Sequence, residues 1–353
     1  MDYQTIPHSR PSLSSSDIRS VSQVLRSGQI SQGSLVSAFE KKFARTFGRK
    51  YGAAVSSGTS ALHLSLLALN IKAGDEVIIP SFVCTAVLNA VNAVGAQPLV
   101  VDIDLPTYNI SAPAVKRALS SRTKAVIVPH MFGCPADMNE LLDTGIPVIE
   151  DCAQAVGSRY REHKTGSLGI LSVFSFYATK VITCGEGGMV LGDSGELISK
   201  IKDRKDYDQK DKYILRYNYK MTDIQAALGM NQLSHLDNFI HRRRKIARRF
   251  LREFKDCSLI LPVQSEEKIH IYYRFVTLAP GEASPYLKKL QKMNIMCRRP
   301  VFRPLHHYLH LSGFPHTEEA WHRCISIPLY PSLDPNEIMR IIAAVKEIFS
   351  DKQ

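Results

Sequence analysis

Between residues 51 and 190 the sequence alternates short apolar runs with helical segments, and this alternation constrains the fold more than any other feature. Helices are expected in intervals such as 59–69 and 83–94. Apolar runs separated by helices indicate a parallel sheet covered on both faces, so we predict an α/β fold. Such sheets bind ligands beyond the carboxyl ends of their strands, where functional residues are therefore expected. The predicted strands are 53–55, 76–80, 98–102, 125–128, 147–150 and 171–176.

The rest of the chain predicts a second, smaller domain. A length of 353 residues suits two domains. We expect residues 1–250 to form a large domain and residues 251–353 to form a small α+β domain, joined by a long helix. The elements predicted outside the sheet region are helices at 16–27, 35–47, 222–254, 285–293 and 336–349 and a strand at 271–278.

Composition excludes several classes of protein. The longest nearly apolar stretch, 60–71, is too short to span a membrane, and the first residues lack the apolar core of a secretory signal. We therefore expect a cytoplasmic protein with no membrane partner. The seven cysteines are scattered without a C-x-x-C pair, which predicts reduced thiols and no metal site.

The net charge of +12 favours an acidic partner: a nucleic acid, an anionic lipid or a small phosphorylated molecule. The densest basic run lies at 241–249. Its simplest interpretation is the solvated face of a helix, and a nucleic-acid surface is the alternative. The chain has one tryptophan and no aromatic stripe among the basic residues, so no nucleic-acid partner is expected.

The first chemical motif is the segment 56–63, Ser-Ser-Gly-Thr-Ser-Ala-Leu-His. A strand ends there in small residues, and a helix opens at Gly58 and Thr59. The free backbone N–H groups and the positive end of the helix dipole favour a phosphate. The same residues are also common in a simple helix cap, and both interpretations stay open at this point.

Two further residues stand at strand ends. Asp151 follows the run 147–150, and its burial would require a cationic partner unless it only caps the next turn. Lys180 follows the run 171–176 and precedes the glycine-rich segment 184–188. A lysine in a partly desolvated pocket is a common Schiff-base nucleophile. A phosphate cradle, a carboxylate for a pyridinium nitrogen and a lysine for an imine together indicate pyridoxal phosphate.

Several segments together resemble the DegT/DnrJ/StrS family of fold-type I pyridoxal-phosphate aminotransferases. The resemblance implies a large domain with a mostly parallel, seven-stranded-type sheet between helices, and a smaller C-terminal α+β domain. It extends over nearly the whole chain through SGQISQGSLVSAFE, SSGTSALHLSL, AGDEVIIPSF, VDIDLPTYNI, PHMFGCPADM, VIEDCAQAVGS, FSFYATKVITCGEGGM, YNYKMTDIQAALGMNQL and SIPLYPSL.

The resemblance implies a role for each matched residue. Lys180 would bind the cofactor covalently and move the proton during transfer, and Asp151 would pair with the pyridine nitrogen. Gln154 would lie beside the ring. The phosphate would be held by Gly58, Thr59 and Ser175, and by Asn218 from the partner subunit of a homodimer with shared active sites.

Three further residues are candidate substrate ligands. The loop 185–188, with Glu186, would line the sugar pocket near the dimer interface. His130 matches a His-x-x-Gly step of the family, although a hydrogen-bonded strand-end histidine explains it nearly as well. His306 is the third candidate.

Two positions depart from the family pattern. Cys84 occupies the position where many relatives carry an aromatic residue that stacks on the pyridine ring, and a thiol would support the ring less firmly. Lys220 replaces the arginine of a Tyr-Arg-Met step, which removes a bidentate contact there.

By resemblance, the reaction transfers an amino group from glutamate, through pyridoxamine phosphate, to a keto sugar carried on a nucleotide diphosphate. The loop 185–188 favours the fourth carbon of the sugar over the third. An aminotransferase of a free cyclitol or sugar phosphate is the main alternative. A sugar dehydratase or a non-catalytic regulator on the same fold is disfavoured by Lys180.

Overall fold

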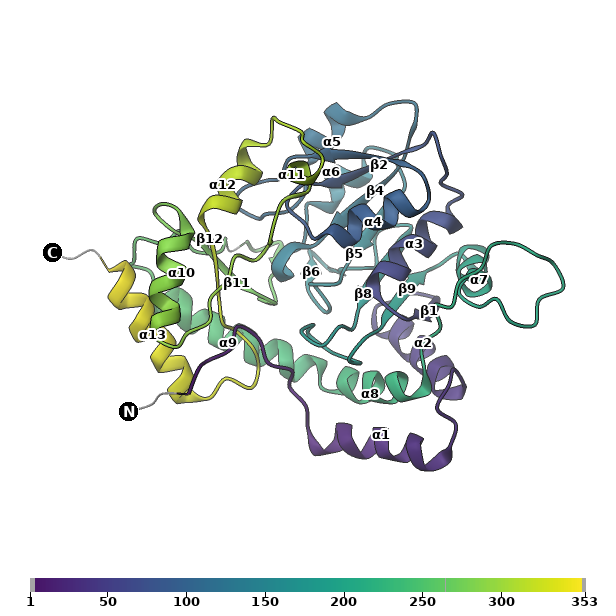
Figure 1. The fold of residues 1–353 in the computed structure, drawn as a ribbon, viewed down its shortest axis with the longest axis horizontal. Helices are drawn as coiled ribbons and strands as arrows, with labels where there is room; N and C mark the ends of the chain where they lie inside the picture. The colour runs from purple at the N-terminus through teal and green to yellow at the C-terminus, as the bar shows by residue number, and fades with distance from the viewer. Residues whose placement is uncertain (1–3, 264, 351–353) are drawn as a thin grey trace.

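The computed structural model describes residues 4–263 and 265–350. A seven-stranded sheet with helices on both faces forms the larger part, and the C-terminal segments pack beside it as a smaller α+β part (Figure 1). Two smaller sheets, of three and two strands, accompany it. None of the helices in the described residues is both long enough and apolar enough to cross a membrane.

The large sheet has the strand order β1-β9-β8-β5-β4-β2-β3. Strands β3, β2, β4, β5 and β8 are parallel neighbours, whereas β9 pairs antiparallel with both β1 and β8. The mostly parallel sheet is therefore confirmed, with all six predicted strands. The strands are β1 Tyr51–Val55, β2 Glu76–Pro80, β3 Gln97–Val101, β4 Thr123–Pro129, β5 Val148–Asp151, β8 Leu171–Ser175 and β9 Gly188–Gly192.

The seventh strand, β9, was not predicted, because the glycines before it indicated a loop. Gly185 and Gly187 do lie in a loop, with φ values of 78° and 152°. Gly188 already belongs to β9, and a Cβ atom there would lie 2.3 Å from the Ser57 carbonyl oxygen. Glycine therefore permits close contact between two backbones at this point of the sheet.

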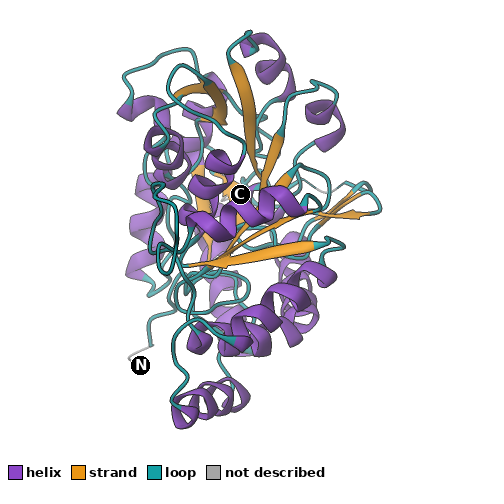
Figure 2. Cartoon of the chain, turned by 90° about the vertical axis from the view of Figure 1, so that its right-hand side faces the viewer, coloured by secondary structure: helices purple, strands orange, loops and turns teal. Residues whose placement is uncertain are grey.

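Helices cover both faces of the sheet because successive strand residues point to opposite sides. Side chains such as Val77 and Ile127 pack against α3 Gly58–Ala68, α4 Thr85–Ala93 and α7 Gly195–Arg204. On the opposite face, the sheet packs against α2 Ser34–Thr46, α5 Ala112–Ala118, α6 Met138–Leu142 and α8 Asp223–Ser234. Figure 2 shows the strands enclosed by these helices.

The smaller part has its own core around Phe250 and Phe275. Ile6 packs in this core and forms a parallel bridge with Ile295, so the first described residues lie with the C-terminal part. The division at residue 250 stays a proposal, and Ile6 lies across it. The elements here are β11 Phe275–Leu278, β12 Cys324–Ile327, α10 Ala283–Lys292, α11 Leu305–Tyr308, α12 Pro315–Arg323 and α13 Pro335–Phe349.

The expected bridging helix is two helices, α8 and α9 Leu236–Glu253. His235 separates them, with a ψ of 0°, and its N–H closes the last turn of α8 on the Gln232 carbonyl at 3.0 Å. The single-helix prediction was wrong because apolar spacing continues through the break. The strand predicted at 271–278 is also shorter, since regular pairing begins only at Phe275.

The basic run on α9 is only partly a solvated face. Arg243 is buried, and it donates hydrogen bonds to the carbonyls of Leu329 at 2.9 Å and Tyr273 at 3.2 Å. Arg242 donates to the Leu333 carbonyl at 2.7 Å. These two arginines therefore join α9 to loops of the smaller part.

The remaining elements are short or peripheral. They are α1 Ser15–Ser27, a 3-10 turn Met131–Gly133, β6 Arg159–Tyr160, β7 His163–Lys164 and β10 Lys268–Ile269.

Candidate active site

The first turn of α3 forms a cradle suited to a phosphate. Ser57 caps the helix and accepts a hydrogen bond from the Ser60 N–H at 3.0 Å. The N–H groups of Gly58 and Thr59 have no acceptor within the helix, because they belong to its first turn. A Cβ atom on Gly58 would lie 2.9 Å from the Ser175 Cβ. The cradle thus brings together three residues predicted to bind phosphate: Gly58, Thr59 and Ser175.

Asp151 ends strand β5 at the same edge of the sheet. Its side chain is nearly buried, and one carboxylate oxygen accepts a hydrogen bond from the Ala153 N–H at 3.0 Å. Burial raises the pKa of Asp151, although the Ala153 N–H and the charges of Lys180 and His130 oppose the shift. A cationic group beside this carboxylate would reverse the shift, and a protonated pyridine nitrogen is such a group.

Lys180 follows β8 and is half-buried, with its backbone N–H bonded to the Tyr177 carbonyl at 2.9 Å. Its Nζ lies 5.4 Å from the centre of the Tyr273 ring. Its positive charge helps to lower the pKa of Tyr273 and opposes the rise in the pKa values of Asp151 and Cys84. These four side chains therefore lie close together at the carboxyl edge of the sheet, and they define what we call the Lys180 crevice.

Tyr273 is a site residue that the sequence did not indicate. Its hydroxyl lies 3.3 Å from Arg274 Nη2 and 3.4 Å from the Thr179 hydroxyl. Burial by itself would raise the pKa of Tyr273, but the charges of Lys180 and Arg274 and the hydrogen bond with Thr179 lower it to about 8. In the sequence this tyrosine belongs to a predicted strand, and no local pattern sets it apart.

Cys84 lies on the wall of this crevice at the start of α4, and its surface is accessible to solvent. Surrounding protein and the Asp151 carboxylate raise the pKa of the thiol, while Lys180 opposes the rise. The thiol is therefore protonated near neutral pH. A side chain that faces the cofactor ring must lie close to both Asp151 and Lys180, and Cys84 meets this requirement.

Gln154 and His130 are held by internal hydrogen bonds. The Gln154 side-chain oxygen accepts from the Phe132 N–H at 3.0 Å, which fixes the amide three residues after Asp151. His130 is buried, accepts from the Ala136 N–H at 3.1 Å through Nδ1, and places Nε2 3.1 Å from Glu150. Both ring nitrogens of His130 thus have protein partners, as expected for a strand-end histidine with a structural role.

Glu150, in strand β5, is the hydrogen-bond partner of His130. The Glu150 carboxylate is fully buried and accepts hydrogen bonds from the N–H groups of Gly166 at 2.7 Å and Gly169 at 2.6 Å. These donors and His130 lower its pKa against the effect of burial. Glu150, a second residue missed from the sequence, therefore anchors the loop 166–169 beneath Asp151.

The other predicted site residues lie nearer the surface or toward the smaller part. Glu186 is exposed, and its carbonyl accepts from Gln225 Nε2 at 2.9 Å. Asn218 is exposed on the loop before α8, next to Tyr219, whose carbonyl accepts from the Ser56 N–H at 2.8 Å. His306 is buried in α11, with Nδ1 2.6 Å from the Ser81 hydroxyl and Nε2 2.9 Å from Glu318.

Within the described part of the chain, two groups of side chains have the donor types of a metal site, with ligand atoms within 4.8 Å of one another: His130, Glu150 and Cys152, and His306, His307 and Glu318. In both groups the histidines are hydrogen-bonded to the glutamate.

These residues fit pyridoxal phosphate. A glycine that cannot carry a Cβ opens the phosphate cradle, the buried Asp151 requires a cation, and the charge of Lys180 acts on Asp151. The fold and the site together define a fold-type I pyridoxal-phosphate-dependent enzyme.

Comparison with known proteins identifies the family. The model of the DegT/DnrJ/EryC1/StrS aminotransferase family matches residues 11–346, and the chain belongs to this family. The GDP-perosamine synthase of Escherichia coli O157:H7 is 36% identical, with 98% of this chain and 99% of that protein covered. The GDP-perosamine synthase of Vibrio cholerae is 33% identical, with the same coverage of 98% and 99%.

Solved structures agree with this assignment. The PLP form of a putative sugar aminotransferase, Spr1654 of Streptococcus pneumoniae, superposes with a TM-score of 0.92 at 25% identity, covering 98% of each chain. DesV of S. venezuelae superposes with a TM-score of 0.90 at 30% identity, covering 96% of this chain and 95% of DesV. The chain is a pyridoxal-phosphate-dependent aminotransferase.

Proposed function

We propose that this aminotransferase converts a nucleotide-linked keto sugar to an amino sugar, with glutamate as the amino donor. The observation that carries the proposal is the convergence of the phosphate cradle, Asp151 and Lys180 in one crevice. The sugar substrate is supported by the names of the relatives, two of which are GDP-perosamine synthases. A net charge of +12 suits capture of a polyanionic substrate in the cytoplasm.

Pyridoxal phosphate, when bound, supplies an electron sink for the carbanion formed at the carbon that bears nitrogen. Lys180 would hold the cofactor covalently, and its free amine would accept and return the proton of the carbon that bears nitrogen. Asp151 keeps the pyridine nitrogen protonated, because its buried carboxylate is stable only beside a positive charge. Gly58, Thr59 and Ser175 would hold the phosphate, in the cradle where a Gly58 Cβ would meet Ser175. Gln154, whose side-chain oxygen accepts from the Phe132 N–H, would lie beside the ring.

The fourth carbon of the sugar is the proposed site of amination. The support is the loop 185–188, whose Gly-Glu-Gly-Gly sequence resembles that of enzymes acting at this carbon. Gly185 and Gly187 have positive φ values, so the loop has a shape that other residues would adopt with strain. Glu186 is exposed at its tip, available to a substrate hydroxyl.

The proposed assembly is a homodimer in which the sites are shared. Asn218 would contact the phosphate of the partner's cofactor. The loop before α8 carries exposed apolar side chains, of which Tyr213 is 93% exposed and Leu215 is 57% exposed. In Figure 1 this loop projects from the body of the chain, beside α7. Large exposed apolar side chains on a projecting loop suit a protein contact.

The test is a panel of GDP-, UDP- and dTDP-linked 3-keto and 4-keto sugars, each incubated with glutamate and the cofactor-loaded protein. Formation of amino sugar and 2-oxoglutarate is measured by mass spectrometry. We expect product from a 4-keto compound. Amination of a free cyclitol or sugar phosphate, with none of any nucleotide sugar, would reject the nucleotide-linked substrate. Loss of a hydroxyl without amination would identify a dehydratase.

A further inference from the structure

Among the described residues of the C-terminal part, three histidines surround one carboxylate, that of Glu318 on α12. His306 and His307 belong to α11, and their Nε2 atoms lie 2.9 Å and 2.6 Å from Glu318 Oε1. His322 lies one helical turn after Glu318, with Nε2 3.5 Å from the other carboxylate oxygen, Oε2. These four side chains therefore direct nitrogen and oxygen atoms into one small space, and we call them the His-Glu cluster.

The His-Glu cluster has the donor set of a zinc-type ion. Imidazole nitrogens and carboxylate oxygens are ligands that Zn²⁺ takes in tetrahedral sites. With bonds of about 2.0 to 2.1 Å, neighbouring ligand atoms of such a site are about 3.3 Å apart. The three distances from Glu318 to the histidines differ from this value by less than about 1 Å, so small side-chain rotations would admit an ion. The spacing of four residues between Glu318 and His322 puts both on one face of α12.

The ring of His306 is fixed in orientation by its contacts with the large part. His306 is buried, its Nδ1 lies 2.6 Å from the Ser81 hydroxyl, and its ring stacks on Phe314 with 4.5 Å between the ring centres. The Ser81 hydroxyl oxygen also accepts from the His306 N–H at 3.2 Å. A histidine that binds a metal usually has its second ring nitrogen hydrogen-bonded in this way, because that contact fixes the proton and the ring. Nε2 is thus the nitrogen that His306 directs into the cluster.

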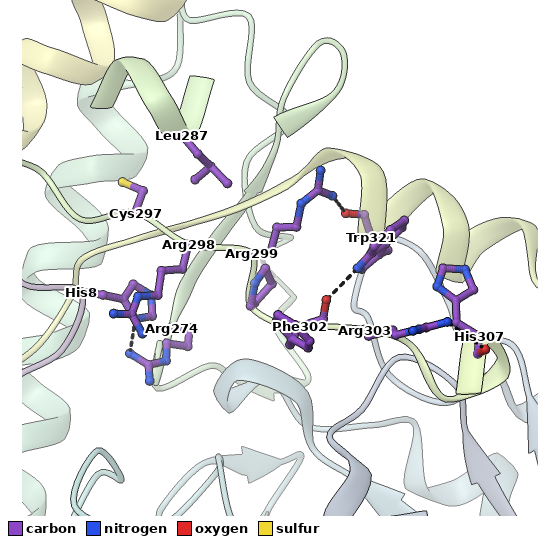
Figure 3. A pocket seen from close by; sticks show the side chains of 11 residues that line it. His8, Arg274, Leu287, Cys297, Arg298, Arg299, Phe302, Arg303, His307 and Trp321 are labelled. Carbon is purple, nitrogen blue, oxygen red and sulfur yellow. Dashed lines mark hydrogen bonds between the residues drawn. The ribbon is translucent and has the colours of Figure 1, made fainter. Parts of the chain in front are cut away.

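The other three side chains of the cluster leave an entry path for an ion. His307 and Glu318 are partly exposed, and the His322 side chain is 54% exposed. Figure 3 shows the His307 ring beside Trp321, where both line a cavity of about 910 Å³. The centres of these two rings are 4.8 Å apart, so Trp321 supports the His307 ring. An ion can therefore reach a group of ligands that neighbouring rings already hold in place.

We propose that the His-Glu cluster binds one divalent transition-metal ion of the zinc type. The ion joins α11 to α12. Because Leu305 and His306 also bond to Ser81, directly after β2, the same ion holds α11 and α12 against the edge of the large sheet. The prediction of no metal site rested on the cysteines, and this donor set contains none. The proposal concerns a site separate from Lys180 and does not depend on the substrate.

Calorimetric titration of the cofactor-loaded enzyme with ZnCl₂, after treatment with a chelator, tests the proposal. We expect one Zn²⁺ per chain and much weaker binding of Mg²⁺, which prefers oxygen ligands. His307→Ala and His322→Ala should each weaken Zn²⁺ binding by about 10-fold or more, because a ligand is lost. Glu318→Gln should weaken it likewise, because the amide has nearly the same size but no negative charge. Circular dichroism checks that each variant is folded.

Glu319→Gln is the matched control. Glu319 is the next residue of α12, its side chain is 39% exposed against 38% for Glu318, and it pairs with Arg323 instead of the histidines. The control removes the same charge from the same helix, so its affinity for Zn²⁺ should equal that of the unaltered enzyme. Equal weakening by Glu319→Gln and Glu318→Gln would show that only net charge matters, and would overturn the assignment. His241→Ala, at an exposed histidine of α9, should also leave Zn²⁺ binding unchanged.

Thermal unfolding gives a second readout. Zn²⁺ should raise the midpoint of unfolding of the unaltered enzyme and of Glu319→Gln, because an ion that binds only the folded chain stabilises it. The three variants of the His-Glu cluster should lack this rise. If they bind Zn²⁺ as tightly as the unaltered enzyme, the ion lies elsewhere, such as at His130, Glu150 and Cys152, and the proposal is rejected. Failure of the unaltered enzyme to bind Zn²⁺ also rejects it, and neither result bears on the proposed amino transfer.

Discussion

Lys180 Nζ lies 5.4 Å from the centre of the Tyr273 ring, and the Arg274 guanidinium lies 4.7 Å from the same point. Tyr273 therefore lies close to both cations, and their charges lower its pKa. The contact joins a loop after the central sheet to the smaller α+β part. It gives the site a second wall that the sheet by itself could not supply.

Lys180→Ala should abolish amino transfer and the covalent, borohydride-trappable attachment of the cofactor. The reason is that the proposed imine uses the amine of Lys180, whose charge acts on Asp151. Mass spectrometry of the reduced protein measures the attachment. Lys255→Ala, at a 69% exposed side chain, is the control and should retain both properties. Covalent trapping in Lys180→Ala would mean that another lysine is the nucleophile.

Asp151→Asn should lower the rate of amino transfer by roughly 100-fold or more. The substitution removes the carboxylate that pairs with the pyridinium, and an unpaired buried charge costs ~3 to 5 kcal/mol. Single-turnover kinetics with glutamate measure the loss. Asp256→Asn, at an 86% exposed position, should leave the rate unchanged. A nearly normal rate in Asp151→Asn would remove Asp151 from the site.

Cys84→Phe should leave the thermal stability of the cofactor-free protein nearly unchanged and should keep or tighten cofactor binding. The thiol has an accessible surface on the crevice wall, so a larger side chain has room. Cys184→Phe is the contrasting variant, because Cys184 is buried and overpacking a core costs roughly 1 to 3 kcal/mol. If both variants lose similar stability with and without cofactor, Cys84 belongs to the packed core.

Tyr273 should titrate near pH 8 in the cofactor-free protein, seen as one tyrosinate absorbance step that disappears in Tyr273→Phe. Tyr272→Phe should keep the step, because burial raises the pKa of Tyr272. The folded-state pKa of Tyr273 lies below the ordinary value of 10, so the folded protein releases this proton first.

Because the folded protein releases the Tyr273 proton at a lower pH than the unfolded chain does, ionisation of Tyr273 favours the folded state. The free energy of unfolding should rise by up to about 2 to 3 kcal/mol between pH 8 and 10, and this gain is lost as the pH falls through 8. Tyr273→Phe should lack the gain. Denaturant unfolding of both proteins across this range measures it, and parallel curves would show that Tyr273 stays neutral.

A mixed dimer of one Lys180→Ala chain and one Asn218→Ala chain tests whether the sites are shared. In a shared arrangement one site carries both defects and the other carries none, so activity should exceed that of either parent dimer. The comparison requires that Asn218→Ala alone is measurably impaired. If Asn218 serves its own chain, every site keeps one defect, and mixing gives only the average of the parents.

The sheet and the ends of its strands could be predicted because their signals are local. The local signals were apolar runs of strand length, a helix cap at Ser57 and polar residues just after the strands. They predict that Gly58, Asp151 and Lys180 lie at the same edge of the sheet. Parallel strands carry their carboxyl ends to the same edge, so these three residues had to converge. Local pattern was insufficient for β9, whose glycines indicated a loop, and for the break at His235.

The tertiary structure alone decided the second wall of the site. Tyr273 and Arg274 are distant in sequence from Lys180 and belong to a segment with no motif of its own. Their position depends on how the smaller part packs against the sheet, including the hydrogen bond from Leu305 to Ser81. The pairing of His130 with Glu150 was decided in the same way, because two neighbouring parallel strands had to align first. Periodicity and caps depend on a few adjacent residues, whereas charge compensation and cavity shape depend on contacts that exist only after the whole chain has folded.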